Sequence, residues 1–214
     1  MITKEMTIAD AIKNKPDIVS ILSDTGIDFC CGGHRPLEEA LNEKNLDISS
    51  YLRILNAHEK AEEKTLESAL HLDKGELIEY IIDHHHKYEL ELLDKIDDYL
   101  KTLINVHYNT HGDELTDIYG LFLKIKADLV PHFYEEEKKY FPPFAAGEDM
   151  DFAKLIDGHE DVGELLQELE SMTNSYTAPE DGCKTYEYCF KLMEDLQNDI
   201  HKHIFLENSV LFIK

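Results

Sequence analysis

Apolar residues recur at intervals of three and four through the last two thirds of the chain, which is the period of an amphipathic α-helix. The pattern predicts four long helices, near residues 74–103, 114–141, 150–173 and 183–211. Turn-rich segments separate these helices at 105–113, 142–149 and 174–182. No alternating strand pattern competes with them. The sequence therefore predicts an all-α protein built on a four-helix bundle.

The N-terminal third has a different pattern. Residues 7–45 are typical of several short helices, and the segment Cys30-Cys31-Gly32-Gly33 indicates a turn, since glycine tolerates positive φ angles. Residues 46–73 are rich in Glu and Lys. We therefore expect three parts: a small helical domain over 1–45, a helical linker over 46–73, and the bundle over 74–214.

Composition narrows the functional classes. The formal net charge of −24 argues against binding to nucleic acid or to an anionic membrane, because both would repel the protein. No apolar run approaches the roughly 18 residues of a transmembrane helix, and the N-terminus lacks the apolar core of a signal peptide. Four cysteines are too few for a disulfide scaffold in a chain of 214 residues. We expect a soluble, cytoplasmic protein.

Twelve histidines are unusually many for this length and suggest a metal site. A His and a Glu four residues apart lie on one helix face, but that spacing occurs five times here and is weak evidence alone. A stronger criterion is whether the His continues the apolar stripe of its helix, because a buried polar cluster is costly without partners. In the first long helix, Ile78 and Ile81 lead to His85 on this criterion.

Each of the four helices places one His in its apolar stripe, and two of them add a Glu one turn later. The predicted metal ligands are His85, His132, Glu136, His159, His203 and Glu207. A single buried His is usually a hydrogen-bonded core residue, whereas four of them on four helices favour a shared site. Without cysteine, the set suits iron or manganese, and it is large enough for two ions if the carboxylates bridge.

Other His and Cys residues have alternative interpretations. His84 and His86, which flank the stripe, either support the metal ligands from behind or, as we expect, are partly exposed. We expect the pair His107 and His111, despite its metal-ligand spacing, to lie in a surface loop. The adjacent Cys30 and Cys31 are either a redox or metal-handling pair or structurally buried thiols, and their spacing does not decide between the two.

Three segments together resemble the repair of iron centres (RIC) family, and the resemblance covers essentially the whole chain. They are Cys30-Cys31-Gly32-Gly33, Gly158-His159-Glu160 continuing to Leu166, and His203-Ile204-Phe205-Leu206-Glu207-Asn208 continuing to Phe212. The resemblance implies a hemerythrin-like bundle with two non-haem iron ions, bridged by oxo and carboxylate groups. The family's iron ligands fall on the six residues named above.

The resemblance also implies a function and partners. It suggests a homodimeric stress-response protein that repairs iron–sulfur clusters damaged by nitric oxide or peroxide, with damaged iron–sulfur proteins as partners. Iron donation is one mechanism, reduction of nitric oxide to nitrous oxide is a second, and reversible binding of oxygen or nitric oxide is a third. Whether the protein is an enzyme stays open. Pro131, directly before His132, is expected to kink the second bundle helix.

Overall fold

The computed structural model describes residues 1–58 and 64–214, which form two compact units. Unit 1 comprises residues 1–80 and 201–214, and unit 2 comprises residues 81–200. Residues 59–63, inside the expected linker, lie outside the described residues. In the described part of the chain, the regular secondary structure is helical apart from one isolated β-bridge between Thr7 and Pro36, so the all-α prediction is confirmed.

Unit 1 begins with short helices whose first turns are capped by side chains. Thr7 accepts a hydrogen bond from the backbone N–H of Asp10, and Asp47 accepts one from Ser50, which satisfies amide groups that a helix start leaves open. The elements are α1 (Ile8–Asn14), α2 (Val19–Asp24), α3 (Leu37–Glu43), α4 (Ile48–Ala57) and α5 (Lys64–Leu70), with the 3₁₀ turns η1 (Pro16–Ile18) and η2 (Gly32–His34).

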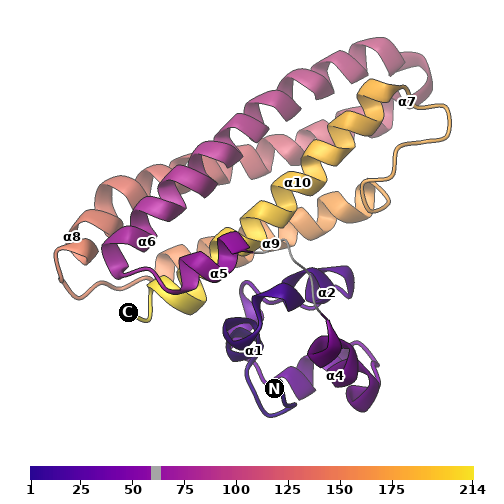
Figure 1. The fold of residues 1–214 in the computed structure, drawn as a ribbon. Helices are drawn as coiled ribbons and strands as arrows, with labels where there is room; N and C mark the ends of the chain where they lie inside the picture. The colour runs from indigo at the N-terminus through magenta and orange to yellow at the C-terminus, as the bar shows by residue number, and fades with distance from the viewer. Residues whose placement is uncertain (59–63) are drawn as a thin grey trace. The chain divides into compact units, whose positions relative to one another are not determined.

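The bundle is formed by long helices interrupted by short π-helical turns. In chain order they are α6 (Lys74–Ile81), η3 (Ile82–His86), α7 (Lys87–Glu135), η4 (Glu136–Tyr140), α8 (Phe141–Ala145), α9 (Ala153–Met172), α10 (Lys184–Leu206) and η5 (Glu207–Leu211). The π-turns η3, η4 and η5 are each five residues long. Unit 2 holds η3 through α9 together with most of α10. Its long helical segments are the parts of α7 before and after His107–His111, α9 and α10, and they pack as a bundle (Figure 1).

The predicted turn between the first two bundle helices lies within α7. His107 and His111 have non-helical backbone angles, and the chain reverses there, so the two arms of α7 run side by side in opposite directions (Figure 1). The next turn starts later than expected. Pro142 sits in the first turn of α8, where its missing N–H costs no hydrogen bond, and the helix continues to Ala145.

Pro131 does not interrupt α7. The residues of α7 with non-helical angles are His107 and His111, so the helix continues through Pro131 to His132, and the expected kink at Pro131 stays a prediction.

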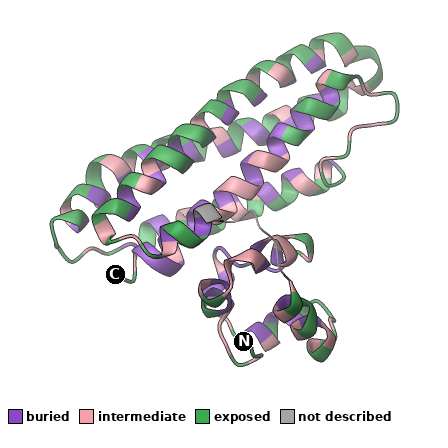
Figure 2. Ribbon diagram, viewed as in Figure 1, coloured by how far each residue is buried: buried purple, intermediate pink, exposed green. Residues whose placement is uncertain are grey.

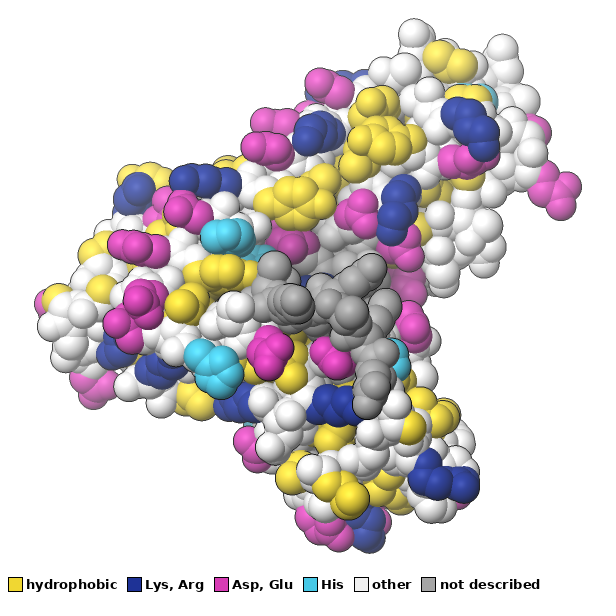
Figure 3. Space-filling model, viewed as in Figure 1, with side chains coloured by type: hydrophobic (Ala, Val, Ile, Leu, Met, Phe, Trp, Pro, Cys, Tyr) yellow, Lys and Arg dark blue, Asp and Glu magenta, His cyan; other side chains and the backbone are white. Residues whose placement is uncertain are grey.

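Buried residues recur along one face of each long helix (Figure 2). In α9 the buried positions are spaced by three and four and include a histidine: Leu155, His159, Val162, Leu166 and Leu169. The face drawn in Figure 3 mixes acidic, basic, histidine and apolar side chains. None of the helices in the described ranges is long and apolar enough to cross a bilayer.

In unit 1, the Cys-Cys-Gly-Gly turn packs against the C-terminal end of the chain. The Asn208 side chain donates a hydrogen bond to the backbone carbonyl of Cys30 at 3.4 Å, and the ring of Phe29 lies edge-on to that of Phe205 at 6.3 Å. A Cβ atom on Gly33 would approach the Oγ of Ser209 to 2.8 Å. Glycine at position 33 therefore lets η2 lie close to η5.

We expect Gly33→Ala to destabilise the protein by about 1–3 kcal/mol, because the added methyl group overpacks this contact. Chemical denaturation monitored by circular dichroism measures the change. Gly120→Ala in α7 is the matched control: no atom lies within 4 Å of its added methyl group, so it should stabilise the helix slightly. Equal effects of the two substitutions would contradict the close packing of Gly33.

Candidate metal centre

Glu136 is the centre of the polar cluster in unit 2. It is completely buried at the start of η4, and its two carboxylate oxygens face different histidines. Oε1 lies 2.9 Å from Nε2 of His132 and 3.6 Å from Nε2 of His159. Oε2 lies 3.4 Å from Nε2 of His86. One carboxylate is thus close to three imidazoles, two at one of its oxygens and one at the other.

The contacts around Oε1 have the spacing of a shared metal ion. The Nε2 atoms of His132 and His159 are 3.0 Å apart, and each is close to Glu136. Ligands held about 2.1 Å from one ion at right angles lie about 3 Å from one another. His132 comes from the second arm of α7 and His159 from α9, so two helices deliver these nitrogens to one point.

The carboxylate of Glu136 makes no well-angled hydrogen bond to any residue in ranges 1–58 and 64–214, although three imidazole nitrogens are near. Burial works against its charge, but the imidazoles of His132, His159 and His86 outweigh that effect and hold the pKa of Glu136 well below its usual range. A buried, ionised carboxylate within reach of nitrogen lone pairs, yet not hydrogen-bonded, fits metal coordination.

His86 is held in place by contacts on all sides. Its ring is completely buried, stacks on Phe133 at 4.5 Å and lies near Phe141. Its Nδ1 lies 3.1 Å from the carboxylate of Glu137, which fixes the ring so that Nε2 points toward Glu136. Metal-binding histidines commonly have such a carboxylate on their second nitrogen. The expectation that His86 is partly exposed is wrong.

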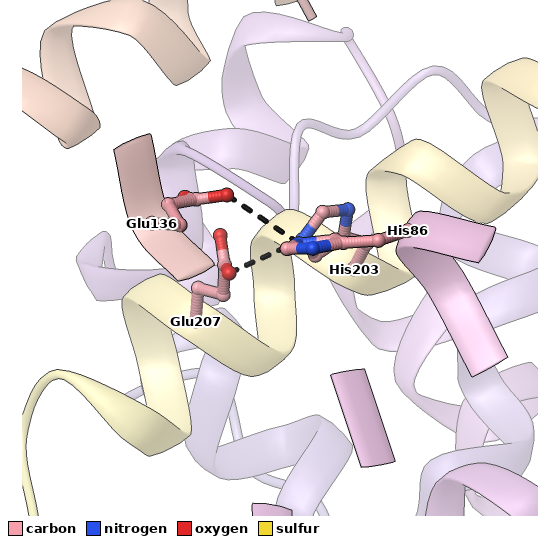
Figure 4. A group of neighbouring side chains, drawn as sticks. All are labelled: His86, Glu136, His203 and Glu207. Atoms are coloured by element: carbon pink, nitrogen blue, oxygen red, sulfur yellow. Dashed lines mark ion pairs between the residues drawn. The ribbon is translucent and has the colours of Figure 1, made fainter. Parts of the chain in front are cut away.

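His203 and Glu207 form a buried pair in unit 1. Nε2 of His203 lies 3.1 Å from Oε1 of Glu207, and the two side chains are one helical turn apart at the junction of α10 and η5. Figure 4 draws this pair together with His86 and Glu136 of unit 2, and its dashed lines mark one ion pair within each unit.

His85 does not join Glu136. Its Nδ1 lies 2.9 Å from the carboxylate of Asp199, and together with buried Glu89 these side chains form a separate cluster. The cause is η3: the N–H of Lys87 bonds to the carbonyl of Ile82, five residues back instead of four. A π-turn adds one residue, so the stripe that reaches Ile81 continues at position 86. Of the predicted site residues in unit 2, the structure brings together His132, Glu136 and His159.

Gly158 makes room for His132. A Cβ atom at position 158 would lie 3.0 Å from Nδ1 of His132, on the side of the ring that faces away from Glu136. Since α9 and the second arm of α7 approach closely here, a side chain at 158 would displace the imidazole. The glycine before His159 therefore has a positioning role that the sequence pattern did not reveal.

Cys30 and Cys31 are free thiols whose sulfur atoms are 3.9 Å apart. Cys30 is buried, and the hydrogen bond with Cys31, burial and the charge of Asp28 raise its pKa well above the usual range. The carboxylate of Asp28 also accepts the backbone N–H of Cys31 at 3.0 Å. The three side chains could hold a cation together, but Cys30 favours the protonated form without one.

A helical bundle with a carboxylate buried among imidazoles belongs to the mixed His–carboxylate class of metal-binding bundles. Residues 77–214 match the family model described as Hemerythrin HHE cation binding domain, and this chain belongs to that family. Residues 4–59 match a second model, ScdA_N, described as a domain of unknown function.

Curated relatives cover nearly the whole chain. The iron-sulfur cluster repair protein ScdA of Staphylococcus epidermidis is 32% identical over all of this chain and 99% of its own length. The iron-sulfur cluster repair protein YtfE of Dickeya chrysanthemi is 27% identical over 98% of this chain and 96% of its own. A probable iron-sulfur cluster repair protein of Haemophilus influenzae is 29% identical over 92% and 90%, respectively. The predicted family is confirmed.

Gly158→Ala should separate stability from metal binding. The substitution favours the helix by up to about 1 kcal/mol but pushes His132 aside, so we expect a lower iron content per chain without a loss of thermal stability. Gly163→Ala, in the same helix with no atom within 4 Å, should keep the iron content of the native protein. Metal analysis by mass spectrometry measures both. Native iron content in Gly158→Ala would show that His132 tolerates the methyl group.

Proposed function

We propose that this chain holds two iron ions in its bundle and uses them to help restore damaged iron–sulfur clusters. The observation that carries the proposal is Glu136, whose two oxygens face separate imidazole groups, as a bridging carboxylate would. The relatives that are named iron-sulfur cluster repair proteins and match 98% or more of this chain support the repair function.

The proposed ligands differ from the sequence prediction at one position. One iron is assigned to His132, His159 and an oxygen of Glu136. We assign His86 to the centre as well, and His203 and Glu207 in unit 1 stay predicted ligands. His86 replaces His85 because its Nε2 lies near Glu136, whereas His85 contacts Asp199.

When bound, the irons would supply redox chemistry and a source of iron. The protein residues hold and protect them. Glu137 orients His86, Phe133 covers its ring, and Glu136 stays ionised at neutral pH. The side chain of His132 is 15% exposed, the most accessible of the unit 2 ligands, so the iron that it binds is the one best placed to exchange.

The division into a domain over 1–45, a linker over 46–73 and a bundle over 74–214 stays a prediction, and the separate family matches at 4–59 and 77–214 support an N-terminal domain distinct from the bundle. The thiols of Cys30 and Cys31 lie beside the end of the chain that carries Glu207 in unit 1, since Asn208 binds the carbonyl of Cys30. We propose that this pair handles iron that leaves or enters the centre. A homodimer stays a prediction.

Repair is tested with an iron–sulfur protein whose cluster has been degraded by nitric oxide. We expect the chain, loaded with isotopically labelled iron, to restore the client's activity and to transfer label into its cluster. Glu136→Gln, which keeps the side-chain volume but loses the charge, should restore little. Recovery that is equal with native protein and with Glu136→Gln would refute the proposal.

The same preparation distinguishes the alternative activities. Nitrous oxide formed in excess of the bound iron, in the presence of nitric oxide and reductant, would identify a nitric oxide reductase. Reversible binding of nitric oxide or oxygen, without nitrous oxide or iron transfer, would identify a carrier or sensor. Either result without client recovery would replace the repair proposal.

His86→Ala and His85→Ala form a matched pair that tests the ligand assignment. His86→Ala removes a direct ligand, so we expect iron affinity to fall by more than about 100-fold, beyond the range typical of changes outside the ligand set. His85→Ala should cost less than about 10-fold. Competition with a coloured iron chelator measures both. A larger loss in His85→Ala would return the assignment to the residue that helical phase predicts.

A further inference from the structure

A second cluster of metal-binding side chains lies in unit 2, at the turn between the two arms of α7. His107 and His111, the pair with metal-ligand spacing, occupy the two non-helical positions of that turn. Across from them is the segment that precedes α10. Nε2 of His107 lies 3.3 Å from the sulfur of Cys183, and Nε2 of His111 lies 2.9 Å from the carboxylate of Asp181. None of these residues belongs to the iron site.

The buried side of this cluster contains a polar group that the protein leaves unsatisfied. Tyr186 is completely buried, and its ring lies edge-on to the imidazoles of His107 and His111 at 5.6 and 5.9 Å. Its hydroxyl has no hydrogen-bond partner in the described part of the chain. Burial, together with the charges of Glu114, Cys189 and Asp181, raises the pKa of Tyr186.

We propose that a divalent cation of the zinc class binds here and joins the turn of α7 to the start of α10, with four ligands: His107, His111, Asp181 and Cys183. A thiolate, two imidazoles and a carboxylate are a ligand set that zinc accepts in tetrahedral geometry. The ligands that we propose for iron in the bundle, by contrast, include no sulfur.

Each of the two observed contacts is close to the separation of two ligands on one ion. Ligands on one tetrahedral zinc ion lie about 3.4–3.6 Å apart, and the two contacts are 3.3 and 2.9 Å. The centroids of the two imidazole rings are 6.3 Å apart, so binding requires the two pairs to move toward each other. Cys183 is exposed and the Asp181 side chain is 66% exposed, which leaves both free to follow.

Two further contacts support ligation. Nδ1 of His111 lies 3.5 Å from Glu114, and a carboxylate on the second nitrogen is the usual arrangement of a metal-bound histidine. The hydrogen bond with His107 lowers the pKa of the Cys183 thiol to about 7. The thiol therefore releases its proton readily near neutral pH when its sulfur binds a metal ion.

Cobalt(II) is the probe, because its bond to a thiolate gives a near-ultraviolet charge-transfer band and tetrahedral cobalt gives intense visible bands. The protein is iron-loaded and carries Cys30→Ser and Cys31→Ser, which leaves Cys183 as the accessible thiol. Cys189 does not compete, since burial raises its pKa to about 12. We expect both sets of bands to saturate at one cobalt per chain and zinc to abolish them.

Variants assign the site. Adding Cys183→Ser should remove the charge-transfer band, and His107→Gln or His111→Gln should weaken cobalt binding by at least about 10-fold. His71→Gln, an exposed histidine in unit 1, should change nothing. Retained iron in each variant verifies the fold. In native protein, zinc should also raise the melting temperature, and Cys183→Ser should remove that rise.

Three results would overturn the proposal. They are the absence of a charge-transfer band, a band that survives Cys183→Ser, and cobalt binding that is unchanged in both histidine variants. None of them bears on the iron centre, because His107, His111, Asp181 and Cys183 are not among its ligands. Failure here is therefore distinguishable from failure of the proposed function.

Discussion

The bundle depends on the burial of one charge, the carboxylate of Glu136. An ionised carboxylate with no exposed surface costs several kcal/mol unless other groups compensate for the lost water. Here His86, His132 and His159 surround it, and they come from η3, the second arm of α7 and α9, respectively. The polar cluster therefore fixes which faces of three helical segments meet, whereas apolar contacts alone would tolerate small rotations.

The π-turns adjust helical phase at this cluster. Glu136 opens η4, Glu207 opens η5 and His86 closes η3, so each of these turns has a predicted or proposed metal ligand at one end. A π-turn inserts one residue into a regular helix, and such insertions are frequent at functional sites. The insertion lets the helix keep its apolar stripe on both sides while one polar side chain is turned toward the site.

Unit 1 couples two segments that are far apart in the sequence. The Cys-Cys-Gly-Gly turn contacts the chain end through Asn208 and the close approach of Gly33 to Ser209, next to the pair His203 and Glu207. The two thiols are not joined in a disulfide, and they share a hydrogen bond. The N-terminal part of the chain is thus built onto the helix end that bears two of the predicted ligands.

The sequence by itself determined the all-α class, the four long helices and the His-Glu pairs 132/136 and 203/207, because periodicity is a local property that survives in any packing. It also identified the family through short motifs. It could not decide between His85 and His86, because three successive histidines occupy these positions and the sequence carries no direct signal for a π-turn. Only the tertiary structure decided that choice, the packing of Gly158 against His132, and the meeting of His107 with Cys183, since each depends on contacts between segments distant along the chain.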